Sequence, residues 1–170
     1  MSTSSRAVIA PAALVVRTAT LEDLDVVVAL RMQLLREEGR SPLYANPRRD
    51  AARHLRLLCE AQLASPSEAS FLATDDGRGI GILRCTVSRV PRLVHPTRYG
   101  FLSSAFVAPS HRRRGVLRAL LLEAERWCRA RGLREVRLHC TVENAEGNAT
   151  WEALGYAPAE VVRRRTLADG

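Results

Sequence analysis

The part of the chain that decides its fold is residues 106–117, which read FVAPSHRRRGVL. The apolar start is typical of the end of a strand, the middle is basic with one glycine, and the last residues begin an amphipathic helix. The N-terminus of a helix carries unpaired N–H groups and a partial positive charge, so it attracts anions. Three arginines directly before the helix add to this attraction, and Gly115 lets the backbone approach a phosphate closely. The pattern predicts a phosphate-binding turn. The alternative that charge alone leaves open is a surface turn with solvated arginines.

Helix and strand patterns continue on both sides of this turn. After Gly115, apolar residues recur with the helical period until Gly132. Before the turn, a strand is predicted over residues 100–107. Further upstream, two apolar runs flank the sequence DDG at residues 75–77, and an Asp-Gly between apolar runs is a strong hairpin signal. The two runs are residues 71–74 and 80–87.

A short strand and two helices are predicted before the hairpin. Residues 14–17 form the strand candidate. TLED at residues 20–23 resembles a helix start, because Thr20 can cap the helix and Asp23 can reach back to it. This helix should end near Gly39, and a second helix should follow the loop at residues 41–47. The apolar faces are predicted to contain Leu21, Leu24, Val28, Leu34 and Leu35 in the first helix, and Leu55, Leu58, Cys59 and Gln62 in the second.

The chain after Gly132 is predicted to form two more strands and a short helix. Apolar and polar residues alternate from Val136 to Val142, as they do in a half-buried strand. A short helix is predicted over residues 149–154, and Val161 and Val162 are expected in a final strand. The resulting order, β-α-α-β-β-β-α-β-α-β, indicates a mixed α/β layer fold.

Composition places the chain among ordinary globular proteins. Of its 170 residues, 46% are hydrophobic and 26% are charged, which excludes a fully disordered chain, a collagen-like fibre and a cysteine-stapled scaffold. The longest apolar run, residues 7–16, contains Pro11 and is shorter than a membrane-spanning helix or the apolar core of a signal peptide with its basic start. We therefore expect residues 1–13 to be a loose tail and the protein to be cytoplasmic. The four cysteines and four histidines have no zinc-binding spacing, so we expect reduced thiols and no metal.

Positive charge is concentrated in the second half of the chain. All 26 basic residues are arginines, which a codon bias would also explain. Residues 1–85 contain 11 arginines and 10 acids, whereas residues 86–170 contain 15 arginines and 8 acids. An anionic partner is therefore expected on the second half, and arginine suits phosphate because its planar fork donates paired hydrogen bonds.

Two segments resemble the GNAT superfamily of acyl-CoA-dependent N-acetyltransferases. Residues 107–116, VAPSHRRRGV, resemble the family's acetyl-CoA signature V-x-P-x-x-R-G-x-G-[IV], and residues 144–156, NAEGNATWEALGY, resemble its N-x-x-A-x-x-x-Y-E-x-x-G-F segment. One helix and one strand lie between them, as in the family. The resemblance implies one domain over residues 14–166 with a mixed, mostly antiparallel central sheet flanked by helices.

The resemblance also implies a binding site for acetyl-CoA, the expected co-substrate. Backbone amides of residues 112–117 would hold the pyrophosphate, the strand ending at Val107 would bind the pantetheine arm, and Asn144 would lie near the thioester. The residues expected at the CoA site are Phe106, Val107, Arg112, Arg113, Arg114, Gly115, Val116, Leu117, Asn144 and Trp151.

Several positions depart from the family pattern. Arg113 stands where the family commonly has glycine. Leu117 stands where the family usually has glycine or alanine. Trp151 replaces the tyrosine that often protonates the leaving thiolate, and an indole has no accessible proton to give. Ser103 and Ser104 stand where family members often have an acid. The catalytic residues are therefore unassigned, and the sequence does not select among Glu37, Glu38 and Glu143 as a base acting through water.

The expected function is transfer of an acetyl group from acetyl-CoA to a primary amine on a small molecule or peptide. In the family, the first two helices and their loop usually form the acceptor site, which implies that Glu37, Glu38 and Tyr44 contact a cationic amine. A CoA-binding module without turnover is the alternative. Nucleic-acid binding is the third and least supported hypothesis, because the arginine clusters lack interleaved aromatic residues. We expect no nucleic-acid or membrane partner, and the acceptor and the oligomeric state are not specified by the sequence.

Overall fold

The computed structural model describes residues 14–167, and these contain a five-stranded sheet with the order β1-β2-β3-β4-β5. Neighbouring strands are antiparallel except β4 and β5, which are parallel. The sheet is therefore mixed and mostly antiparallel, as the sequence and the resemblance predict. The strands are β1 (Val15–Thr18), β2 (Glu68–Asp75), β3 (Arg78–Arg89), β4 (Arg98–Val107) and β5 (Val136–Leu138).

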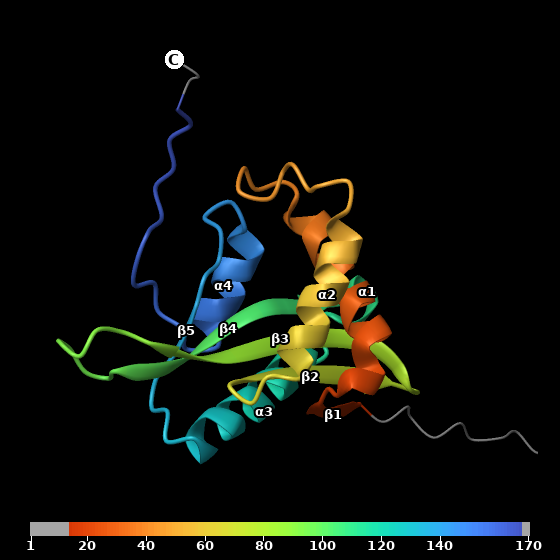
Figure 1. Cartoon of the computed structure of the whole chain (residues 1–170), viewed down its shortest axis with the longest axis horizontal. Coiled ribbons are helices and arrows are strands. Elements are labelled where there is room, and N and C mark those ends of the chain that lie inside the picture. Colours follow the sequence, from red (N-terminus) through yellow and green to blue (C-terminus); the bar gives the residue numbers. More distant parts are fainter. Residues whose placement is uncertain (1–13, 168–170) are drawn as a thin grey trace, which may run out of the picture. The chain divides into compact units, whose positions relative to one another are not determined.

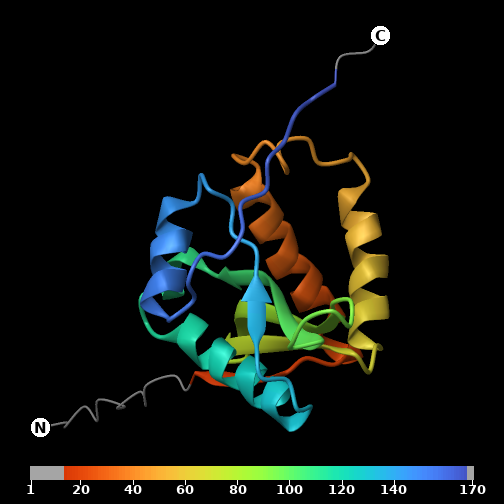
Figure 2. The same cartoon turned by 90° about the vertical axis from the view of Figure 1, so that its left-hand side faces the viewer.

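The described chain forms two compact units, one ending at His139 and the other beginning at Cys140. The first unit contains the sheet and three α-helices. Helices α1 and α2 cover one face of the sheet and α3 covers the other (Figures 1 and 2). No helix in residues 14–167 is long and apolar enough to cross a membrane. The helices are η1 (Leu21–Asp23), α1 (Leu24–Glu38), α2 (Ala51–Leu63), η2 (Pro109–His111), α3 (Val116–Ala130) and, in the second unit, α4 (Ala145–Ala153).

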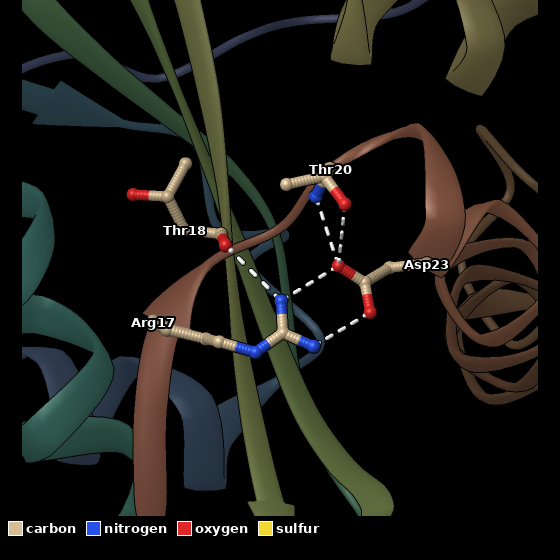
Figure 3. Close-up of polar contacts among 4 residues, drawn as sticks. All are labelled: Arg17, Thr18, Thr20 and Asp23. Carbon is tan, nitrogen blue, oxygen red and sulfur yellow. Dashed lines mark hydrogen bonds and ion pairs between the residues drawn. The ribbon is translucent and has the colours of Figure 1, made fainter.

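The join between β1 and α1 is held by the carboxylate of Asp23 (Figure 3). Both of its oxygens accept hydrogen bonds from Arg17 at 2.7 Å, and one also accepts from the Thr20 N–H at 2.8 Å. These contacts lower the pKa of Asp23 to about 2, with the Arg17 hydrogen bonds as the main cause. The predicted Thr20 cap is confirmed, and the helix begins as the 3-10 turn η1 before α1.

The core of the first unit has two layers, one on each face of the sheet. On the α3 face, the buried helix residues are those of the predicted 3.6-residue period, although Val116 rather than Leu117 is the first of them. Burial of a leucine such as Leu120 stabilises the folded state by roughly 1.5–3 kcal/mol relative to an exposed side chain. On the other face, buried residues of α1, α2 and the sheet form one cluster, which contains Ala19, Val27, Leu30, Cys59, Leu72, Ile82 and Phe106.

A bulge in β3 turns two nearby glycines toward opposite helices. Ala73 pairs with Gly81 and Thr74 with Gly79, so β3 contains one more residue than β2 at this point. A Cβ on Gly79 would overlap Val26 of α1, whereas a Cβ on Gly81 would lie 3.2 Å from Leu120 of α3. The bulge therefore lets both helices approach the sheet closely.

The predicted apolar faces of the first two helices are partly wrong. Leu21 is 52% exposed and Leu58 is 48% exposed, whereas Val27 and Leu30 are the buried residues of α1. The 3-10 turn shifts the phase of α1, and neither helix is covered on all of its apolar side.

The prediction for the C-terminal strands is also partly wrong. Strand β5 contains only three residues, because only Gly100 to Leu102 of β4 pair with it, and Val142 is 70% exposed. Val161 and Val162 lie in extended chain outside any strand, and α4 begins at Ala145 rather than Ala149. The predicted tail, residues 1–13, lies outside the described residues.

Candidate functional site

The turn between β4 and α3 has the geometry of a backbone anion site. It begins after Val107, where the Ala108 N–H donates to the Ile80 carbonyl at 2.8 Å, and it ends at Gly115, which caps α3. Gly115 has φ +79°, and a Cβ built on it would meet no atom within 4 Å. The cap of α3 therefore faces open space, as the sequence predicts for a close approach to a phosphate.

The backbone N–H groups at this end of α3 are unpaired. Within the described chain, those of residues 113–118 donate to no protein acceptor, and the first helical bond is from Ala119 to the Gly115 carbonyl at 3.0 Å. Side chains do not cap them either. Unpaired donors and the helix dipole together favour a negative group here. The turn is thus suited to binding an anionic group.

Arg113 adopts the backbone conformation that glycine prefers. Its φ is +61°, in the left-handed region that costs energy for a residue with a Cβ. The GNAT signature commonly has glycine at this position. Arg113 therefore differs from the motif in its side chain, whereas its backbone has the left-handed conformation that a glycine can adopt.

The three arginines of the turn lie in different surroundings. The Nη2 group of Arg112 donates to both carboxylate oxygens of Glu37 at 2.7 and 2.6 Å, and its Nε donates to the Val107 carbonyl at 3.0 Å. Arg113 and Arg114 are exposed and form no ion pair with the described residues. Arg112 thus has its Nε and Nη2 groups engaged by the protein, whereas the guanidinium groups of Arg113 and Arg114 are available to meet a phosphate.

His111 has a polar contact at each of its ring nitrogens. Its Nε2 lies 3.2 Å from Asp75 Oδ2, its Nδ1 lies 2.9 Å from Ser110 Oγ, and its side chain is 22% exposed. The contact joins the turn to the end of β2. No sequence pattern identified Asp75 as a partner, because it lies 36 residues away at the end of β2.

The apolar residues assigned to the CoA site differ in how they are placed. Phe106 is buried in the core beneath α1 and α2, and Val116, the first residue of α3, is buried against β3. Val107 and Leu117 are half-buried. Phe106 and Val116 therefore have side chains directed into the protein, and only their backbone atoms are available to a ligand.

Strand β4 has a serine where family members often have an acid. The β3–β4 register shifts between Ile82 and Arg84, and Ser104 in this bulge has φ +53°. The Ser103 hydroxyl accepts a hydrogen bond from Arg84 Nη1 at 2.9 Å, and Arg84 Nε donates to Glu68 at 2.7 Å. The nearest carboxylate shown in this network belongs to β2 and is neutralised by Arg84. Sequence reasoning missed Glu68 and Arg84, because strand pairing brings them together.

The predicted acceptor residues lie at the end of α1 and in the following loop. Glu37 is bound to Arg112, as described above. Glu38 is half-buried, burial raises the pKa of its carboxyl group, and that group has no ion-pair partner among residues 14–167. Tyr44 is 41% exposed, and its N–H donates to the Ser41 carbonyl at 2.9 Å. Glu38 is thus the better placed of the two glutamates to pair with a cationic group.

Asn144 and Trp151 belong to the second unit. Asn144 begins α4, where its Oδ1 accepts from the Gly147 N–H at 2.8 Å. The Trp151 indole packs edge-on against Tyr156, with ring centroids 5.5 Å apart. Their assignment to CoA stays a prediction. The exposed Glu143 is likewise untested as a base. In the described part of the chain, no group of three His, Cys, Asp or Glu residues could hold a metal ion.

Comparisons with known proteins identify the family. The profile of the acetyltransferase (GNAT) family matches residues 32–156. Aminoglycoside N(6')-acetyltransferase type 1 of Salmonella typhimurium is 33% identical over 95 residues, which are 55% of this chain and 66% of that protein, just under two thirds of its length.

Two solved structures share the fold along most of the chain. Aminoglycoside N-acetyltransferase AAC(6')-Iy in complex with CoA has a TM-score of 0.77 and 26% identity, with 95% of this chain and 99% of that chain covered. A GCN5-related N-acetyltransferase from Ralstonia eutropha JMP134 has a TM-score of 0.74 and 25% identity, with 91% and 99% covered. With the family profile matching most of the chain across both motif segments, the protein belongs to the GNAT family of acetyltransferases.

Proposed function

We propose that this protein transfers an acetyl group from acetyl-CoA to the primary amine of a small molecule. The observation that carries the proposal is the run of unpaired backbone N–H groups at residues 113–118, at the start of a 15-residue helix. Family membership and the CoA complex of the structural neighbour support the same ligand.

The residues that would hold CoA are those of the turn. Backbone amides of residues 113–118 would receive the pyrophosphate, and the exposed Arg113 and Arg114 would add positive charge. The backbone of β4 near Val107 would bind the pantetheine arm. Acetyl-CoA supplies a thioester whose acetyl group passes to an amine nitrogen while the CoA thiolate leaves.

Catalysis in this proposal depends on placement more than on a strong acid or base. A thiol with a pKa near 8.5 leaves largely unaided, and positioned acid–base groups typically add about 10²–10⁴-fold. Ser103 has no proton-accepting charge, and Glu37 is neutralised by Arg112. Glu38 is therefore our candidate to bind the ammonium form of the acceptor and to accept its proton, directly or through water. An adjacent ammonium would favour the charged carboxylate that burial now disfavours.

The names of two relatives support one class of acceptor. Two of those compared above are named for aminoglycosides, which makes a multiply aminated sugar the first candidate. Glu38 is suited to one of its ammonium groups. The departures at Ser103 and Trp151 keep a CoA-binding module without turnover as the second candidate.

The test is direct detection of acetylated product. Purified protein is incubated with acetyl-CoA and a panel of amines, namely aminoglycosides with a 6'-amine, polyamines, amino acids and peptides with a free N-terminus. Mass spectrometry then measures acetylation above the uncatalysed rate. We expect turnover of at least one small-molecule amine, reduced about tenfold or more by Glu38→Gln with the affinity for CoA unchanged.

Trp151→Tyr separates the two candidate functions. It restores a hydroxyl with a pKa near 10 at the family's tyrosine position. An enzyme that has dispensed with this tyrosine retains or gains activity in the variant. Wild-type protein that binds acetyl-CoA yet acetylates no amine, together with activity gained by Trp151→Tyr, would establish the silent binding module instead.

A further inference from the structure

The Glu37–Arg112 ion pair joins two residues for which the sequence suggests separate roles. Glu37 is near the end of α1, in the predicted acceptor region, and Arg112 is in the predicted CoA turn, 75 residues further along the chain. Both carboxylate oxygens accept from the same guanidinium nitrogen. The pair therefore connects the acceptor side of the protein to the turn.

The guanidinium of Arg112 is held on several sides. Nη2 is directed to Glu37, Nε to the Val107 carbonyl, and the guanidinium carbon lies 6.0 Å from the centre of the Phe106 ring. Val107 and Phe106 are the last residues of β4. Arg112 thus bridges the end of β4 to the end of α1, with two of its three guanidinium nitrogens engaged by the protein.

The neighbouring residue anchors the same turn to a different element. His111 contacts Asp75 at the end of β2, as described above. Two consecutive side chains therefore fix the start of the turn to β2 and to α1. The residues that follow, 113–118, are the ones whose backbone N–H groups are unpaired. A fixed start and free donors afterwards are what a preorganised anion site requires.

We propose that Glu37 and Arg112 are positioning residues, which hold the turn in the shape that receives CoA without contacting its phosphates. The inference rests on the proposed binding of CoA at this turn. Glu37 orients Arg112, and Arg112 fixes the Val107 carbonyl and the start of the turn. Of the three arginines, Arg113 and Arg114 then supply the charge that the phosphates meet.

A direct phosphate contact by Arg112 predicts the opposite effect of removing Glu37. If Arg112 bound phosphate, Glu37 would compete for it, and Glu37→Gln would tighten CoA binding. If Glu37 positions the turn, the same variant weakens CoA binding, although the protein has become more positive. The sign of the change therefore separates the two roles.

The experiment is calorimetric titration of CoA into wild type, Glu37→Gln, Arg112→Gln, the double variant, and Glu60→Gln as a control for charge on exposed α2. We expect Glu37→Gln and Arg112→Gln each to raise the dissociation constant about fivefold. The double variant should be no weaker than Arg112→Gln, because both changes remove one interaction. Glu60→Gln should equal wild type. Equal or tighter binding by Glu37→Gln overturns the inference.

Arg112→Lys and the salt dependence supply further readouts. Lysine retains the charge but lacks the planar fork that reaches two acceptors, so Arg112→Lys should bind CoA as weakly as Arg112→Gln. The salt dependence of CoA affinity should be shallower in Arg114→Gln than in wild type and unchanged in Arg112→Gln. Full affinity in Arg112→Lys, or a shallower slope in Arg112→Gln, would make Arg112 a phosphate ligand.

Two controls make each result interpretable. Far-ultraviolet circular dichroism at the assay temperature checks that every variant is folded, which we expect because the paired side chains are 39% and 43% exposed. If Glu37→Gln does not fold, Glu37→Asp keeps the charge but shortens the side chain, and it should weaken CoA binding similarly. Wild-type protein that does not bind CoA would refute the proposed function, whereas wild-type binding with unaffected variants would refute only the positioning role.

Discussion

Gly115 is the single residue on which the proposed CoA-binding turn depends most directly. An aspartate there would place a side chain and a negative charge in the open space before α3, where we expect the pyrophosphate. Thermal unfolding with and without saturating CoA should show a clear ligand-induced rise in Tm for wild type, since a ligand that binds only the folded state stabilises it. Gly115→Asp should stay folded and lose most of that rise.

Gly132 offers a matched control for this variant. It has φ +69° and no atom within 4 Å of a built Cβ, but it lies at the other end of α3. Gly132→Asp therefore introduces the same charge and a similar backbone strain away from the turn. It should keep the full rise in Tm; an equal loss in both variants would mean that the loss is not specific to the turn.

The left-handed backbone of Arg113 predicts that glycine at this position is at least as stabilising as arginine and that valine is less so. Glycine adopts φ +61° without strain, so Arg113→Gly should leave the free energy of unfolding unchanged or raise it by a few tenths of a kcal/mol. Arg113→Val should lower it by about 1–2 kcal/mol, because a β-branched residue is poorly suited to this conformation. Urea unfolding measures both. Arg114 is outside the set of residues with positive φ, so Arg114→Gly should destabilise; stabilisation by that change would contradict the argument.

At the scale of elements, the join between β1 and α1 should be sensitive to acid. The pKa of Asp23 is about 2, below its usual value near 4, so the ionised carboxyl group stabilises the fold above pH 4. This stabilisation is lost as the pH falls through about 2. Asp23→Asn should lower the free energy of unfolding near pH 7 by about 1 kcal/mol, with allowance for solvent around the half-exposed Arg17.

The check is urea unfolding of wild type and Asp23→Asn between pH 2 and pH 7. The difference between the two proteins should shrink as the pH falls below 4. Glu22→Gln, which removes a neighbouring charge without a direct hydrogen bond to Arg17, is the control and should follow wild type. A pH-independent difference would mean that Asp23 acts through its shape rather than its charge.

At the scale of the whole molecule, one long stretch of the chain carries positive charge alone. Residues 77–122 contain nine arginines and no acid, and they include the entire turn. If the partner is CoA, backbone amides neutralise much of its charge, so its affinity should fall less than about tenfold between 50 and 200 mM salt. A protein with 6–10 nucleic-acid phosphate contacts loses about 10³–10⁵-fold over that range.

The measurement is CoA titration at both salt concentrations, with retention of a generic DNA duplex as the comparison. We expect CoA binding to persist at 200 mM salt and duplex retention to be absent there. Tight, steeply salt-dependent duplex binding with indifference to CoA would instead support the nucleic-acid alternative.

The sequence by itself determined the order of the elements as far as α4 and the position of the turn. Alternating and helical periods, the hairpin turn at residues 75–77, the Thr20 cap and the Gly115 cap are all local signals, because each depends on residues within about four positions of one another. For the same reason the two family motifs could be read directly, and they predicted a GNAT protein with its CoA turn after β4.

Only the tertiary structure decided which side chains of the site are free and which are already bound. Arg112 and Glu37 are 75 residues apart, and Glu68 and Ser103 are brought to Arg84 by strand pairing. The length of β5, too, is a matter of strand pairing, since only Gly100 to Leu102 of β4 pair with it. No periodicity encodes such contacts, because they arise when elements distant in sequence pack together, and packing sets the partners of each charged side chain.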